Sequence, residues 1–160
     1  MSRRSQKGFT MIELLIVISI LSILVRVSLP AYKGIQRDAV ATQALGDFNT
    51  VRAAAVAQYE ATGAYAVDGP TGVVPGGMAP FLPRNYSFTK EQYSLDWENF
   101  AVSDSTMGAG LSGNVLALTI TASDSLVGRQ ILHMVGSNCA HWSLENSHTF
   151  VVLSTLEAPH

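Results

Sequence analysis

The sequence holds a single cysteine, Cys139, among its 160 residues, so no disulfide can form within the chain. Charged residues make up only 14% of the chain and aromatic residues 8%. Several catalytic motifs are also missing: the phosphate-binding P-loop, the zinc-binding HExxH, the GxSxG nucleophile elbow and a paired CxxC. We therefore predict that the chain is not an enzyme, and we expect Cys139 to be a small buried hydrophobe.

Histidine and acidic residues show no pattern of metal ligation. His133, His141 and His148 are not at ligand spacings on any element that the sequence predicts, and the pair His141 and Trp142 is interpreted as a surface feature. The acidic residues of the second half are scattered, namely Asp104, Asp124, Glu145 and Glu157. The sequence thus predicts no metal site and no cofactor.

The charge balance argues against nucleic acid as a partner. Ten Lys and Arg residues face twelve Asp and Glu residues. Three of the ten, Arg3, Arg4 and Lys7, lie in the first eight residues, so the rest of the chain has seven basic and twelve acidic residues, a formal net charge of −5. An acidic surface is repelled by phosphate backbones, so no specific nucleic acid contact is expected.

What the sequence does have is one long apolar run, residues 9–29, directly after the basic peptide MSRRSQK and Gly8. At helical rise this run is about 31 Å long, the thickness of a bilayer's hydrocarbon core. Two charges interrupt it, Glu13 and Arg26, and a charge at membrane depth costs on the order of 2.5–3.5 kcal/mol. A plain anchor has no use for Glu13, which therefore calls for a partner.

The basic peptide orients this span with the N-terminus in the cytoplasm and the rest of the chain outside. A cleaved secretory signal peptide is the competing interpretation. It fits poorly, because the apolar run is too long and the one candidate cleavage site, Leu29-Pro30-Ala31, contains a bulky residue and a proline.

Residues 7–32 resemble the N-terminus of type IV prepilins and of the pseudopilins of type II secretion. The matching features are the leader ending in Lys7-Gly8, then Phe9, Glu13 five residues into the mature chain, and Pro30 followed by Ala-Tyr. The resemblance implies cleavage between Gly8 and Phe9 by prepilin peptidase, N-methylation of Phe9, and assembly of subunits into a helical filament. The predicted assembly residues are Glu13 and Pro30. Arg26 departs from the family pattern, which is usually apolar there.

The implied partners are other pilin subunits in a homo- or heteropolymer, the prepilin peptidase and methyltransferase, the inner-membrane assembly platform and the lipid bilayer. The implied location is the inner membrane as a single-pass protein, and then a surface pilus or a periplasmic pseudopilus. Many type IV pilins close a C-terminal loop with a disulfide, and its absence here tilts the resemblance toward pseudopilins or minor pilins. A calcium loop such as the major pseudopilins carry is not transferred to this chain.

Two functions of different classes therefore stay open. The first is a filament subunit, either of a type IV pilus-like filament or of a type II secretion pseudopilus. The second is a monomeric binding domain held in the membrane by a signal anchor. In this case the Glu13 side chain only extends toward the membrane–water interface. The anchor explains neither the Gly8-Phe9 step nor Glu13.

The sequence divides into a leader (residues 1–8), a membrane or filament-core helix (9–29), an amphipathic continuation of that helix (30–62) and a globular part (63–160). Pro30 is expected to kink the helix. An apolar stripe predicts which face of the continuation packs on a sheet, with Asp38 and Asp47 on the solvated face. The stripe consists of Ala41, Leu45, Phe48, Val51, Ala55 and Tyr59.

The globular part begins with a glycine- and proline-rich loop over residues 63–92, which Phe81-Leu82-Pro83 is expected to pin to the core. Strands are predicted at residues 93–100, 115–121 and 148–155, with a Ser- and Gly-rich turn at 103–114. Asp124 is expected to cap a short helix that ends at Gly136. The predicted fold class is α+β, a long helix against a small antiparallel sheet, as in pilins.

Overall fold

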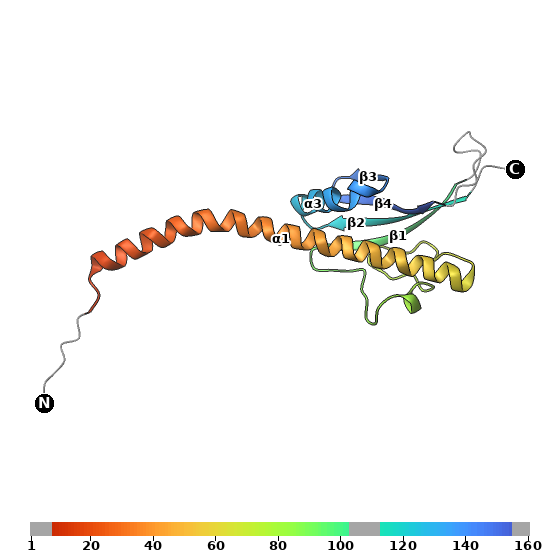
Figure 1. Ribbon diagram of the computed structural model, residues 1–160, viewed down its shortest axis with the longest axis horizontal. Helices are drawn as coiled ribbons and strands as arrows, with labels where there is room; N and C mark the ends of the chain where they lie inside the picture. The colour runs from red at the N-terminus through yellow and green to blue at the C-terminus, as the bar shows by residue number, and fades with distance from the viewer. Residues whose placement is uncertain (1–7, 103–112, 155–160) are drawn as a thin grey trace, which may run out of the picture. The chain divides into compact units, whose positions relative to one another are not determined.

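The computed structural model describes residues 8–102 and 113–154. Two long elements come first, helix α1 (Met11–Thr62) and strand β1 (Tyr93–Val102), with the short 3-10 helix η1 (Ala79–Phe81) between them. The remaining elements are β2 (Gly113–Ala122), α3 (Ser125–Val135), η2 (Gly136–Asn138), β3 (His141–Leu144) and β4 (Ser147–Ser154). The chain is α+β, as the sequence predicts (Figure 1). It divides into two compact units, residues 1–36 and 37–160, which are described separately below.

The four strands form one antiparallel sheet in the order β1-β2-β4-β3. Alternate residues of β1, β2 and β4 point to the core, so Leu95 of β1 lies opposite Ile120 of β2, which lies opposite His148 of β4. These three side chains are buried. The three predicted strands are confirmed to within a few residues at their ends. The predicted turn at residues 103–114 lies almost entirely outside the described residues.

Strand β3 is not among the strands predicted from the sequence. All four of its residues, HWSL, are exposed. Among the described strands it pairs only with β4, so it forms an edge of the sheet. A strand with no buried face carries no apolar alternation, and this removes the pattern by which strands are recognised.

The second unit begins inside α1, and the apolar stripe of this part of the helix packs on the core face of the sheet. Phe48 meets Phe150 of β4 edge to face, with ring centroids 6.1 Å apart. Most of the predicted stripe is buried, but Leu45 is only half-buried and Tyr59 is exposed, stacked on Tyr65 at 4.5 Å. The helix ends as predicted at Gly63, whose φ of 72° is the left-handed conformation that glycine adopts at low cost.

Asp47 corrects the expectation that it lies on a solvated face, because its side chain is buried. Its carboxylate accepts hydrogen bonds from the hydroxyls of Tyr86, at 2.8 Å, and Tyr93, at 2.5 Å. Lys90 adds an ion pair at 3.4 Å. A buried carboxylate is tolerated when it is paired in this way, and its partners come from the loop and β1, more than 35 residues away in sequence.

The loop over residues 63–92 is attached to β1 by backbone hydrogen bonds. Gly72 donates to the carbonyl of Leu95, and Leu95 donates to the carbonyl of Phe88, both at 2.8 Å. The indole of Trp97, fully buried, donates to the carbonyl of Ala66 at 3.1 Å. Leu82 is buried in the core, which confirms that the segment after η1 pins the loop.

Helix α3 covers a further part of the same core with Val127, Ile131 and Val135. Asp124 caps its N-terminus, accepting a hydrogen bond from the backbone N–H of Leu126 at 3.3 Å, and Gly136 follows its last residue. Both boundaries agree with the prediction, because the capping signals are local in sequence.

Candidate processing and assembly site

Gly8, Phe9 and Thr10 lie outside regular secondary structure, immediately before α1. All three are exposed, and the Phe9 side chain is 77% exposed. A Cβ atom placed on Gly8 would meet no atom within 4 Å. Packing within the chain therefore does not require a glycine at position 8, so any requirement for it must come from another molecule.

Glu13 does not stand alone at the start of α1, because it forms a reciprocal pair with Thr10. The backbone N–H and the hydroxyl of Thr10 both donate to Oε2 of Glu13, at 2.9 and 2.8 Å. In return, the backbone N–H of Glu13 donates to the Thr10 hydroxyl at 3.3 Å. This is a capping box, which satisfies two backbone donors that a helix N-terminus leaves free. The carboxylate also lies at the end of the helix where a negative charge is favoured.

The apolar part of α1 exposes its side chains on every face. Within the described residues, α1 is the one helix long and apolar enough to cross a membrane, by length and composition. None of its most apolar window is buried in the chain. A surface of this kind requires lipid or other protein as its environment, since water would not tolerate so large an apolar patch.

Three serines in this segment are satisfied within the helix itself. The hydroxyls of Ser19, Ser22 and Ser28 donate to the carbonyls four residues earlier, each at 2.7 Å. Polar groups that are paired inside the segment lower the cost of placing it in hydrocarbon. The serines are therefore compatible with a membrane span.

Pro30 and Arg26 lie near the end of the apolar segment. Pro30 is inside α1, which continues through it, and the predicted kink stays a prediction. Arg26 is exposed, and in the region the structure describes it makes no ion pair. The basic residues of the leader, Arg3, Arg4 and Lys7, lie outside the described residues.

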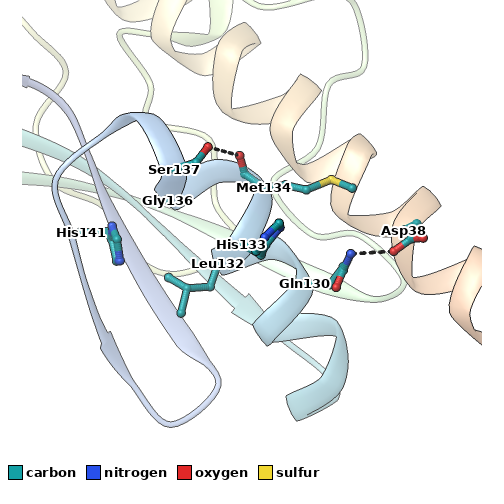
Figure 2. A pocket seen from close by; sticks show the side chains of 8 residues that line it. All are labelled: Asp38, Gln130, Leu132, His133, Met134, Gly136, Ser137 and His141. Atoms are coloured by element: carbon teal, nitrogen blue, oxygen red, sulfur yellow. Dashed lines mark hydrogen bonds between the residues drawn. The ribbon is translucent and has the colours of Figure 1, made fainter.

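The second unit carries an open groove of about 630 Å³ beside α3. Figure 2 shows Asp38 of α1 facing Gln130 of α3, whose amide donates to the Asp38 carboxylate at 2.6 Å. His133 and His141 approach the groove from α3 and β3. The other lining residues are Leu132, Met134, Gly136 and Ser137. The groove holds no nucleophile paired with a base, so nothing in its lining suggests catalysis.

The other face of the sheet carries two carboxylates of β1, Asp96 and Glu98. Thr71 donates to Asp96 at 2.5 Å, and Thr119 donates to Glu98 at 3.3 Å. Burial raises the pKa of both carboxyl groups, and repulsion from Asp68 adds to the effect. Among the described residues, no three His, Cys, Asp or Glu side chains are grouped so that they could hold a metal ion.

Gly8, Phe9 and Glu13 are predicted from the sequence, whereas Thr10, which the structure places against Glu13, is not among the predicted residues. The signal was present, because Thr-x-x-Glu before an apolar run is the sequence signature of a capping box. Gly8 and Phe9 lie next to this pair in the chain. Pro30 belongs to a different part of the helix.

Comparison with known families agrees with the N-terminal geometry. Residues 3–25 match the prokaryotic N-terminal methylation motif, which is the signal segment of type IV pilins and pseudopilins. The resemblance predicted from the residues is thereby confirmed for this segment. No curated protein and no solved structure matches the chain.

The matched family is a structural one rather than a family of enzymes. The motif indicates a pilin-like or pseudopilin-like substrate of prepilin peptidase, and it implies polymerisation in general terms. Together with the apolar helix it also indicates anchoring in a membrane.

Proposed function

We propose that this chain is a structural subunit of a type IV pilus-like filament, inserted in the inner membrane as a prepilin, cleaved after Gly8 and polymerised through its N-terminal helix. The observation that carries the proposal is the methylation motif at residues 3–25. The start of α1 supports it, because this segment combines an open glycine, an exposed Phe9 and a capped Glu13.

Cleavage after Gly8 follows from the chemistry of the exposed segment. A peptidase must bind the chain on both sides of the bond that it cuts, and a residue without a side chain lets the backbone approach closely. Gly8 and Phe9 lie outside α1, so the bond between them is not protected by a helix. Removal of residues 1–8 leaves an amine on Phe9, the proposed site of methylation.

The proposed division of the chain assigns residues 9–29 to the membrane, residues 30–62 to the second half of the helix and residues 63–160 to the globular part outside. Arg3, Arg4 and Lys7 hold the leader in the cytoplasm until it is cut. The assembly platform of the inner membrane would then extract the mature subunit.

Glu13 is the proposed assembly residue. Its Oε2 atom accepts both bonds from Thr10, whereas Oε1 makes no hydrogen bond within the described chain. Oε1 is thus available to the Phe9 amine of a neighbouring copy. The capping box would stabilise the carboxylate before assembly, and the amine would compensate its charge once both are buried.

A pseudopilin of a type II secretion system is the second candidate, favoured by the cysteine. Cys139 is half-buried, and its thiol donates to the carbonyl of Val135 at 3.4 Å. As the one cysteine of the sequence it cannot form the C-terminal disulfide that closes many type IV pilins.

The first test is the intact mass of the protein extracted from membranes of cells with an active prepilin peptidase. We expect loss of residues 1–8 and gain of one methyl group. Gly8→Val should leave the precursor uncut, and Gly8→Ala is the matched control with a small side chain. A wild-type protein that keeps its first eight residues in those cells would contradict the proposal.

The second test separates a filament subunit from a monomeric anchored domain. Glu13→Leu removes the carboxylate, so it should insert and be cleaved normally but fail to enter filaments collected by shearing. Ser19→Ala, in the same segment, should assemble normally. Filaments on the cell surface would favour the pilus, and ladders of crosslinked subunits confined to the periplasm would favour the pseudopilus. Normal assembly of Glu13→Leu would remove the proposed role of the carboxylate.

A further inference from the structure

Three of the four histidines in the sequence lie on neighbouring elements of the second unit. His133 is in the last turn of α3, His141 is on β3, and His148 is on β4. His133 and His141 are exposed and line the groove of Figure 2. His148 differs from both, because only 3% of its surface is exposed.

His148 lies directly beneath α3. A Cβ atom placed on Gly128 of α3 would be 2.8 Å from Nε2 of His148 and 3.5 Å from its Cδ2. The imidazole ring therefore packs on the backbone of the helix, at the one residue of α3 that leaves room for it. On its other side, Nδ1 is 2.8 Å from the hydroxyl of Ser143 on β3.

Among the described residues, the site offers no hydrogen-bond acceptor for the second N–H group that a protonated ring would carry. Nε2 is buried and has no hydrogen-bond partner in the described part of the chain. A charged imidazolium donates from both nitrogens, so protonation would leave a charged N–H group unpaired against the backbone of α3. A buried unpaired charge is among the most costly features a protein can contain.

The surrounding charges do not offset this cost. Burial lowers the pKa of His148, and the nearby His141 lowers it further. The titratable groups of α3 itself are Arg129 and His133. Of the acidic groups in the second unit, Asp38 is bonded to Gln130, Asp124 caps α3, and Glu145 is in the turn between β3 and β4.

We propose that His148 is an acid-sensitive latch: the neutral ring allows α3 to pack on the sheet, and protonation of the ring releases α3 from it. A released helix exposes the imidazole to water, where it binds a proton with its ordinary affinity. The native packing is therefore favoured above about pH 6.5 and is lost progressively below it. Since α3 also supplies Gln130, His133 and Met134 to the groove, acid would reshape that surface as well. The latch is independent of cleavage and assembly.

The test is hydrogen exchange, measured by mass spectrometry on the full chain in detergent micelles at about pH 7.5 and about pH 5. After correction for the intrinsic pH dependence of exchange, protection of the peptide covering α3 should fall at the lower pH, by up to about thirtyfold for one proton bound with an ordinary histidine pKa of about 6.5 in the released state. Peptides of β2 serve as the internal reference and should keep their protection. Equal protection of α3 at both pH values would overturn the proposal.

His148→Gln removes the titratable group, so protection of α3 should no longer depend on pH. His133→Gln and His141→Gln are matched controls and should retain the dependence. If the loss of protection persists in His148→Gln, the latch is wrong. A measurement on the wild-type chain does not rely on the variant folding: NMR titration of the His148 ring should show protonation together with loss of α3 protection, and protonation with α3 still protected would overturn the proposal.

Discussion

Asp47 of α1 and Tyr93 of β1 are 46 residues apart in the sequence and are joined by a hydrogen bond of 2.5 Å from the tyrosine hydroxyl to the carboxylate. Tyr86 bonds the other carboxylate oxygen, and Lys90, whose ammonium lies 4.3 Å from the centre of the Tyr86 ring, completes the group. One carboxylate thus ties the helix, the loop and the first strand together.

Asp47→Ala should destabilise the chain by about 2–4 kcal/mol, because it leaves the hydroxyls of buried Tyr93 and half-buried Tyr86 and the ammonium of Lys90 without their acceptor. Glu60→Ala, at an exposed position of the same helix, is the control and should change stability by less than about 0.5 kcal/mol. Urea unfolding in mild detergent, followed by the fluorescence of the buried Trp97, measures both. Equal midpoints for the two variants would show that the Asp47 cluster adds no stability.

Alkaline pH should weaken the same cluster. Burial raises the pKa of Tyr93 and of Tyr86, and hydrogen bonding to Asp47 raises both further. The native state therefore holds these protons more tightly than the unfolded state, whose tyrosines titrate near pH 10, so stability falls as the pH rises above about 10. In Tyr93→Phe the midpoint of unfolding should be lower at neutral pH and should depend less on pH above 10. An unchanged alkaline slope would contradict this assignment.

Asp96→Asn should stabilise the chain at neutral pH, by less than about 1 kcal/mol because the site is partly solvated. Burial raises the pKa of Asp96, so the native state favours the protonated form. Protonated Asp96 therefore contributes fully to the stability of the native state below the pKa of this group in the unfolded chain, about 4. This contribution is lost as the pH rises. The gain from the amide should therefore vanish in thermal unfolding near pH 4. Glu91→Gln, at an exposed position, is the control and should show no such gain.

Two helical glycines should respond in opposite directions to alanine. A Cβ on Gly128 would meet the ring of His148 at 2.8 Å, so Gly128→Ala should cost about 1–3 kcal/mol through overpacking. A Cβ on Gly46 would meet no atom within 4 Å, so Gly46→Ala should gain up to about 1 kcal/mol of helix propensity. Thermal unfolding compares them directly. A stabilised Gly128→Ala would mean that His148 does not pack on α3 as described.

The features that the sequence predicted well are those whose signals are local. Asp124 and Gly136 bound α3 within a residue of the expected ends, since capping residues act on the turn next to them. The apolar run and the helix stripe were likewise recognised from their own spacing.

The features that were missed depend on distant partners or have no pattern at all. The burial of Asp47 could not be inferred, because its partners Tyr86 and Tyr93 are brought to it only by the path of the loop. Strand β3 exists through its pairing with β4 rather than through any buried face of its own. Thr10 differs from these missed features, because its partner Glu13 is only three residues away and the capping pattern is visible in the sequence.

The contact between Phe48 and Phe150 also sets an order of events during synthesis. Phe48 leaves the ribosome about a hundred residues before the strand that covers it, and at bacterial elongation rates this delay is about 5–20 s. Until then the apolar stripe of α1 has no sheet to pack on. We expect the newly made chain to need a temporary cover for this stripe, from a chaperone or from the membrane surface, before its last strand arrives.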